Sequence, residues 1–189
     1  MAPGDAREDR RVTNDGLTKR LAAAVRDIPD FPKPGIVFKD ITPILLDPPL
    51  FDDTLDALAR WAEERRTEKV IGIDARGFLF AGPVANRLGV GLIPVRKTGK
   101  LPHRTEREAY DLEYGSAELE IHVDAIGSGE RVTVIDDLLA TGGSAQATAR
   151  LVERLGGVVA GLGFVIELGF LNGRERLDGY DCHSLVHYE

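Results

Sequence analysis

The chain has 189 residues and a formal charge of −7, with 43% hydrophobic and 29% charged residues. This composition indicates a globular, soluble protein and excludes a wholly disordered chain. The negative charge disfavours non-specific attraction to nucleic acid or to an anionic membrane, so an anionic ligand would need a local site. No apolar run approaches the roughly 20 residues of a membrane span, and the amino end has no apolar signal core. We therefore expect a cytoplasmic protein without nucleic-acid or membrane partners.

The composition along the chain predicts a short tail followed by one domain. Residues 1–14 are polar, carry both signs of charge and lack periodic apolar positions, so a disordered tail is expected. Residues 15–189 are expected to form a single domain, because compact domains commonly reach this length. Cys182 is the only cysteine, so an internal disulfide is excluded and no role is assigned to it.

The first third of the chain predicts two helices separated by a loop. Apolar residues at helical spacing predict a helix over residues 15–28, with Asp15 as a plausible cap. The proline-rich residues 29–49 predict an ordered loop with short extended pieces, since each proline restricts its own backbone and that of the preceding residue. A second amphipathic helix is expected from Phe51 to Ala62.

Strand and helix patterns then alternate. Short apolar runs rich in β-branched residues predict buried parallel strands at residues 69–74, 90–95, 131–136 and 158–166. Helical patterns occupy residues 77–89 and 143–156. The alternation is typical of an α/β domain with a central, mostly parallel sheet flanked by helices. In such sheets ligands bind beyond the carboxyl ends of the strands.

Residues 98–115 interrupt this alternation. The segment "TGKLPHRTEREAYDLEYG" contains seven charged residues, and a loop of this length within a domain is usually a functional flap or disordered. The following "AELEIHV" alternates apolar and polar residues, which predicts an edge or hairpin strand. His183 and His187 fall on one face of a further probable strand. Their surroundings supply too few ligands for zinc, so structural roles are expected.

The segment "VTVIDDLLATGGSAQA" at residues 132–147 carries the strongest chemical signal. A buried strand ends at Asp136 and Asp137, and a helix begins near Gly142 to Ser144. Unpaired N–H groups at a helix start bind phosphate, and acidic residues accept hydrogen bonds from sugar hydroxyls. The motifs G-x-x-x-x-G-K-[ST] and G-x-G-x-x-G are both absent from this helix start. The segment indicates a ribose 5-phosphate site, although an ordinary turn and helix cap would account for this motif taken alone.

These residues resemble a known family. "VIDDLLATGGS" resembles the phosphoribosyl pyrophosphate (PRPP) motif of type I phosphoribosyltransferases, and its ATGG form is most similar to the members that act on adenine. The segments "FPKPGIVFKDITPIL", "GIDARGFLFAGPVANRLGVGLIPVRKTGKLP" and "YDLEYGSAELEIHVDAI" resemble the same family in the same order. The resemblance extends over residues 15–189. It implies the fold of that family, with an N-terminal hood and a flexible flap.

The resemblance also implies an activity. Family members that act on adenine join its N9 to C1 of PRPP, giving AMP and pyrophosphate in purine salvage. It further implies Mg²⁺ as cofactor, held through PRPP near Asp136 and Asp137 without a confident direct protein ligand, and a homodimer. Two alternatives remain: transfer to another purine such as xanthine, and a regulator of the same fold that senses PRPP without catalysis.

The resemblance assigns roles to particular residues. Those implied for the phosphoribosyl group are Asp136, Asp137, Ala140, Thr141, Gly142, Gly143 and Ser144. Those implied for pyrophosphate are Asp74, Ala75, Arg76, Arg96, Lys97 and Lys100. Those implied for adenine are Val37, Phe38 and Lys39, with Phe38 stacking on the purine and main-chain groups of the other two reading its edge. Glu113 is the implied acid or base, and Tyr114 helps to close the site.

Simpler interpretations and departures from the family accompany these roles. Phe38 could be a core residue, Glu113 could be solvated on a mobile loop, and Arg104 and Arg107 are expected on a solvated face. Many family members have Arg where this chain has Lys39, which matters only if the side chain reads the base. The chain also has Ala75 where some relatives have Ser, and Ser144 where many have Thr.

Overall fold

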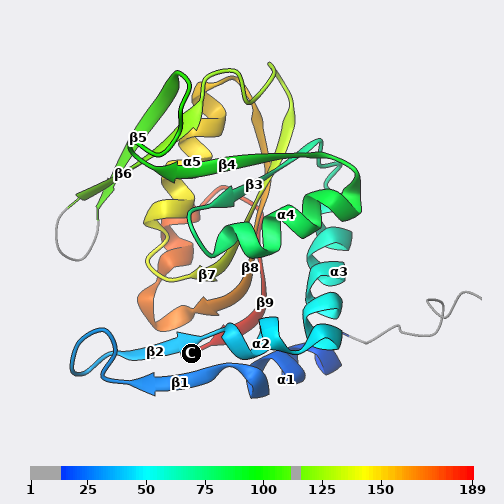
Figure 1. The fold of residues 1–189 in the computed structure, drawn as a ribbon, viewed down its shortest axis with the longest axis vertical. Helices are drawn as coiled ribbons and strands as arrows, with labels where there is room; N and C mark the ends of the chain where they lie inside the picture. Colours follow the sequence, from blue (N-terminus) through cyan, green and yellow to red (C-terminus); the bar gives the residue numbers. More distant parts are fainter. Residues whose placement is uncertain (1–13, 112–115) are drawn as a thin grey trace, which may run out of the picture. The chain divides into compact units, whose positions relative to one another are not determined.

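The computed structural model describes residues 14–111 and 116–189 (Figure 1). The chain divides into two compact units, the first ending at Thr54 and the second running from Leu55 to Glu189. Apart from Asn14, the predicted disordered tail lies outside the described residues, as do Glu113 and Tyr114. The prediction of one domain over residues 15–189 stays a prediction.

The first unit contains a helix, a two-stranded sheet and a short second helix. Its elements are α1 (Asn14–Ala24), β1 (Arg26–Pro29), β2 (Val37–Asp40), α2 (Thr42–Leu46) and the first residues of α3 (Pro48–Glu64). The stripe of α1 is buried at Leu17 and Leu21, as its periodicity predicts. The predicted extension of this helix to Ile28 is wrong, because Ile28 lies in β1 opposite Phe38 of β2. Apolar spacing alone could not separate one more helical turn from this short antiparallel strand.

The second unit is built on a seven-stranded sheet. Its strands are β3 (Lys69–Ile73), β4 (Gly91–Lys97), β5 (Thr105–Asp111), β6 (Ser116–His122), β7 (Arg131–Leu139), β8 (Val158–Leu168) and β9 (Cys182–Tyr188). They lie in the order β5, β6, β4, β3, β7, β8, β9. The pairs β3–β4, β3–β7, β7–β8 and β8–β9 are parallel, whereas β4–β6 and β5–β6 are antiparallel. The expected mostly parallel α/β sheet is therefore confirmed.

Helices cover both faces of this sheet. Gly72, Ile135 and Gly163 are neighbours in register and point to one face, where α4 (Gly77–Leu88) and the second half of α3 pack. A Cβ on Gly72 would lie 2.9 Å from the ring of Phe78, and one on Gly163 would lie 2.9 Å from the ring of Trp61. The other face carries α5 (Gly143–Arg154), which is seen beside the sheet in Figure 1. Helices α4 and α5 begin at Gly77 and Gly143, where the sequence pattern predicted them.

The predicted flap contains a strand that the sequence did not indicate. Residues 105–111 form β5, which pairs along its length with β6. The expected hairpin strand β6 is therefore present, but much of the segment treated as a loop is regular structure. Arg154 of α5 is held against β5 by ion pairs with Glu106 and Glu108, so charged side chains stabilise this edge strand in place of apolar ones. For that reason the sequence of β5 shows no regular alternation of apolar and polar residues.

The chain ends in two short 3₁₀ turns and a strand. The turns η1 (Gly169–Leu171) and η2 (Gly173–Leu177) lie between β8 and β9. His183 of β9 stacks on Trp61 with ring centroids 5.4 Å apart, and burial lowers its pKa. No group of three or more metal-binding side chains occurs within residues 14–111 and 116–189. Within the same ranges, no helix combines the length and the apolar character needed to cross a membrane.

Candidate active site

A polar cavity of about 300 Å³ lies at the carboxyl ends of β3 and β7, where an α/β sheet binds its ligands. It belongs entirely to the second unit. Its lining residues are Ile73, Asp74, Ala75, Arg76, Lys97, Tyr110, Asp136, Asp137, Leu138, Leu139, Ala140, Thr141, Gly142, Gly143, Ser144 and Ala145. The structure therefore brings together all seven residues predicted for the phosphoribosyl group and four of the six predicted for pyrophosphate.

Two adjacent carboxylates lie within the last part of β7. The strand continues to Leu139, beyond the end predicted at Asp136 and Asp137. Both side chains are nearly inaccessible, with 8% of Asp136 and 4% of Asp137 exposed. The backbone N–H of Asp137 donates to Asp136 Oδ1 at 3.0 Å. Arg76 Nε lies 2.9 Å from Asp137 Oδ2 as an ion pair, but the described residues donate no hydrogen bond to that oxygen.

This environment makes ionisation of the pair costly. Burial raises the pKa of Asp136 well above its ordinary value, and the charge of Asp137 raises it further. Burial also raises the pKa of Asp137, while the charge of Arg76 acts in the opposite direction. Since the Arg76 ion pair and the local hydrogen bonds do not fully replace the lost hydration, the pair retains capacity to bind hydroxyl donors or a cation.

The loop that follows β7 has the features of a phosphate-binding cradle. Gly142 has φ of +79°, a left-handed conformation that favours glycine, and α5 begins at the next residue. The first backbone N–H groups of a helix have no acceptor within it and carry positive potential. The hydroxyls of Thr141 and Ser144 lie in the same cavity lining. The arrangement suits a phosphate group with its ester oxygen directed toward Asp136 and Asp137.

The turn after β3 forms the opposite wall. The Asp74–Ala75 peptide bond is cis, and Arg76 directly precedes α4. A Cβ on Gly77 would lie 2.6 Å from Asp136 Oδ1, so the close approach of α4 to that carboxylate requires glycine. This turn thereby holds Arg76 against Asp137.

The predicted cations take different positions. Lys97 at the end of β4 lines the cavity, whereas Arg96 and Lys100 lie outside its lining. Arg96 Nε donates to Asp74 Oδ2 at 3.1 Å. The backbone N–H of Lys100 donates to the buried Glu120 at 2.9 Å, which fixes the start of the flap. The roles of Arg96 and Lys100 toward pyrophosphate stay predictions.

The three residues predicted for adenine lie in the first unit. Val37, Phe38 and Lys39 form most of β2. Phe38 contacts Phe31 edge to face with ring centroids 5.2 Å apart, and the Lys39 ammonium lies 2.6 Å from Asp27. Lys39 is thus engaged within its own sheet, an arrangement that fits recognition through main-chain groups better than through its side chain.

Sequence reasoning missed Tyr110. This residue of β5 lines the cavity. Burial raises the pKa of the phenol, and the charge of Asp136 contributes to the rise, so the hydroxyl remains a neutral donor. In the sequence, Tyr110 is a single tyrosine within a charged segment. Its place in the cavity lining depends on the pairing of β5 with β6, which the sequence pattern did not predict.

Comparison with known proteins identifies the family. Residues 49–182 match the phosphoribosyl transferase domain. An adenine phosphoribosyltransferase of Solibacter usitatus is 54% identical over 89% of this chain and 98% of its own. The crystal structure of adenine phosphoribosyltransferase from Thermoanaerobacter pseudethanolicus has a TM-score of 0.88 and 52% identity, covering 90% of this chain and 99% of that one. The chain belongs to the adenine phosphoribosyltransferase family.

A further family member adds information on ligands. The enzyme of Saccharomyces cerevisiae is 40% identical and matches with a TM-score of 0.86, covering 90% of this chain and 99% of its own. It was solved with adenine and the bisphosphate D-2,5-dideoxy-2,5-imino-altritol 1,6-bisphosphate. Family membership confirms the fold expected from the sequence motifs.

The buried carboxylates predict an unusual balance of stability and activity. Because the folded-state pKa of Asp136 is raised, its deprotonation opposes folding, and this penalty grows as pH rises from about 3.8 through the folded-state value. Asp136→Asn should therefore raise the melting temperature of the ligand-free protein at pH 7 by a few degrees while lowering turnover about a hundredfold. Calorimetry and a transfer assay measure the two effects. A lower melting temperature at pH 7, with the difference unchanged at pH 5, would contradict this account.

Proposed function

We propose that this protein transfers the phosphoribosyl group of PRPP to adenine, giving AMP and pyrophosphate, as a purine salvage enzyme. The observation that carries the proposal is the single cavity in which a phosphate cradle, two buried carboxylates and the Arg76 turn face one another. Membership of the adenine phosphoribosyltransferase family supports the choice of reaction. The structure of a relative with adenine supports the choice of base.

The reaction forms the bond from N9 of adenine to C1 of the ribose and breaks the bond from C1 to the pyrophosphate oxygen. Positive charge develops on the sugar, and Asp136 and Asp137 stabilise it while accepting hydrogen bonds from the ribose hydroxyls. The N–H groups at residues 142–144 and the hydroxyls of Thr141 and Ser144 hold the 5-phosphate. Arg76 and Lys97 face the departing diphosphate, and Asp74, Ala75, Arg96 and Lys100 complete that side.

Mg²⁺ fits this site through its substrate. Asp137 Oδ2 is buried and lies 2.9 Å from Arg76 Nε as an ion pair, and its remaining acceptor capacity suits a metal-bound water or a sugar hydroxyl. Because no cluster of three or more protein ligands occurs in the described ranges, PRPP would supply most of the oxygens. When bound, the ion neutralises charge on the leaving diphosphate.

The adenine and flap assignments extend the proposal beyond the cavity. Phe38 stacks on the purine and the main chain of Val37 and Lys39 reads its edge, since β2 pairs only with β1 in the described sheets. Glu113 exchanges a proton with the purine, and Tyr114 helps to exclude water, which would otherwise compete for the activated sugar.

We also propose a cytoplasmic homodimer. Leu79 of α4 and Leu92 of β4 are each 45% exposed, and a second copy of the chain would cover this apolar face. Sedimentation should then give about twice the chain mass of 20.6 kDa. A monomer at micromolar concentration would contradict the dimer without affecting the reaction assignment.

Substrate specificity provides the direct test of the function. Incubation with Mg²⁺, PRPP and one purine at a time should release pyrophosphate with adenine at least about a hundredfold faster than with xanthine or guanine. Release with xanthine or guanine instead would reassign the substrate. PRPP binding without release for any base would identify a sensor of the same fold.

Tyr110 provides a second test, because this residue lines the cavity proposed for PRPP. Tyr110→Phe retains the ring and removes only the donor, so the KM for PRPP should rise about tenfold while the KM for adenine changes little. Tyr180→Phe is the matched control, since that hydroxyl donates to Glu153 at 3.0 Å outside the cavity. Equal KM values for PRPP in the two variants would exclude a contact between Tyr110 and the substrate.

A further inference from the structure

The phosphate cradle is in backbone contact with a turn that lies about thirty residues further along the chain. A Cβ placed on Gly142 would overlap the carbonyl oxygen of Gly173, and one placed on Gly173 would overlap that of Ala140. The same Cβ on Gly173 would lie 3.0 Å from the backbone nitrogen of Gly142. Neither glycine can be replaced without displacing the other segment, so the shape of the cradle depends on the position of η2.

A side-chain hydrogen bond forms a second link between the two segments. Gln146 on the first turn of α5 donates from Nε2 to the carbonyl oxygen of Arg176 in η2 at 2.7 Å. The helix that begins the cradle is therefore tied to the same turn that contacts Gly142. Any shift of η2 would move both the loop and the helix start.

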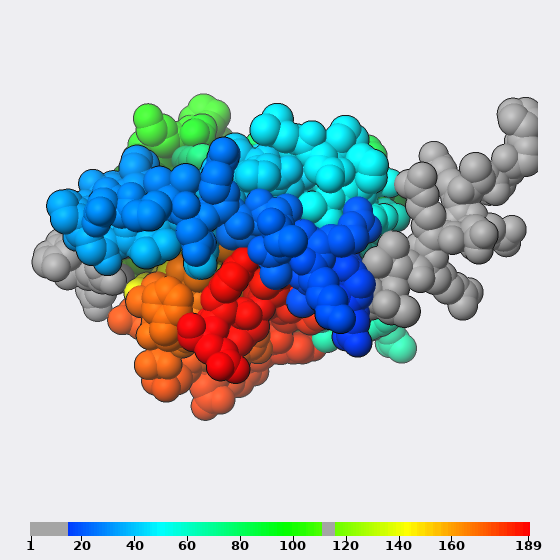
Figure 2. Space-filling view, turned by 90° about the horizontal axis from the view of Figure 1, so that it is seen from below, coloured from blue at the N-terminus to red at the C-terminus, as the bar shows by residue number. Residues whose placement is uncertain are grey.

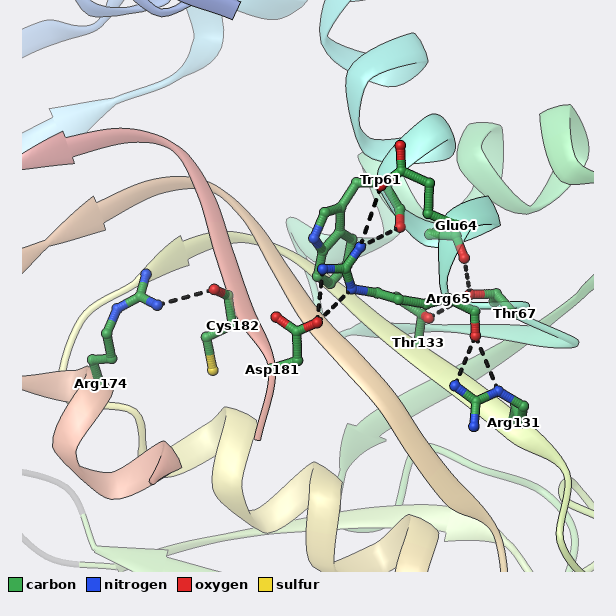
Figure 3. Close-up of polar contacts among 10 residues, drawn as sticks. Trp61, Glu64, Arg65, Thr67, Arg131, Thr133, Arg174, Asp181 and Cys182 are labelled. Carbon is green, nitrogen blue, oxygen red and sulfur yellow. Dashed lines mark hydrogen bonds and ion pairs between the residues drawn. The ribbon is translucent and has the colours of Figure 1, made fainter. Parts of the chain in front are cut away.

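A buried ion pair anchors η2 to the sheet. Glu167 near the end of β8 is 3% exposed, and Arg174 of η2 contacts both its carboxylate oxygens, with Nε 2.9 Å from Oε1. Ser184 donates to Oε2 at 2.7 Å. Arg174 also donates to the carbonyl of Cys182 at 3.0 Å, as Figure 3 shows. The hydrogen bonds from Arg174 hold the pKa of Glu167 at about 2. The pair thus stays ionised at neutral pH and stabilises the fold until the pH falls from about 4.5 toward 2.

This cluster lies outside the cavity lining. Glu167 and Arg174 are absent from the cavity wall, and the turn that they hold occupies the surface beside β9, orange next to red in Figure 2. The planar guanidinium of Arg174 contacts both oxygens of the Glu167 carboxylate. Such a bidentate contact fixes direction as well as distance, which a surface turn does not require.

We infer that Glu167 and Arg174 are positioning residues for the 5-phosphate of PRPP, acting through the backbone of Gly173. The inference rests on the proposed function for the identity of the ligand. By holding Gly173 against residues 140–142, the pair keeps the N–H groups of the cradle directed at one point before the phosphate arrives. Small displacements of such donors are costly to binding, and the loss should fall on the phosphate and not on adenine or pyrophosphate.

The test compares the ligands of the site separately. In Glu167→Gln the dissociation constant of ribose 5-phosphate and the KM for PRPP should rise about tenfold, while pyrophosphate affinity and the KM for adenine stay within about twofold. Gln146→Ala removes the second link from a partly buried position and should raise the same two constants about threefold. This variant decides the question if Glu167→Gln does not fold.

The matched control is Arg65→Gln. Arg65 pairs with Asp181 at 2.7 Å and lies over Trp61, in the same unit but without contact to η2 or the cradle (Figure 3). It should lower the melting temperature without changing the ratio of ribose 5-phosphate to pyrophosphate affinity. A similar loss for all ligands in Glu167→Gln, or unchanged ribose 5-phosphate binding, would overturn the inference.

The same measurements separate this inference from the proposed function. If the wild-type protein transfers phosphoribosyl to no purine, the proposed function fails. The positioning role still holds in that case if Glu167→Gln selectively weakens ribose 5-phosphate. If the wild type is active and the variant binds ribose 5-phosphate normally, only the positioning role fails.

Discussion

The burial of two adjacent carboxylates at the end of β7 is the constraint around which this site is organised. Removing Asp136 and Asp137 from water opposes folding, and the chain offsets that cost only in part, with local hydrogen bonds and the ion pair to Arg76. Gly77 lets α4 approach Asp136 closely enough for this arrangement. The two carboxylates therefore keep unused hydrogen-bonding capacity, which a polyhydroxylated, charged ligand can fill. The site is preorganised at the expense of the stability of the ligand-free protein.

This arrangement also explains how a chain with a net charge of −7 can hold a highly anionic substrate. The positive potential is local, and the unpaired backbone N–H groups at the start of α5 contribute to it. Arg76 and Lys97 add formal charge at the cavity wall. Fixed dipoles of this kind do not need to reorganise when negative charge builds up on the departing diphosphate. The acidic remainder of the surface does not interfere, because exposed charges are screened within about 10 Å.

The sequence predicted those parts of the molecule in which local pattern and final structure agree. The strands β3, β7 and β8 are buried on both faces, so their β-branched runs were visible without tertiary information. In β4 only Ile93 and Val95 are fully buried, but its apolar run was visible in the same way. The cradle could be predicted because strand, loop and helix are consecutive in the chain. By contrast, β5 is an edge strand whose charged side chains pair with Arg150 and Arg154 of α5. Nothing within its own seven residues shows that such a partner exists, and Tyr110 was missed with it.

The cradle itself shows where local reasoning ends. "ATGGS" specifies a tight turn and a helix start, and a positive φ at Gly142 accounts for one glycine without reference to any other segment. It does not account for the absence of space around that glycine, which comes from Gly173 and therefore from the ion pair that anchors η2. A loop with the same five residues but without this support would retain its N–H donors and lose their common direction. Since phosphate affinity depends on several donors converging on one point, the functional motif is the loop together with the turn that supports it.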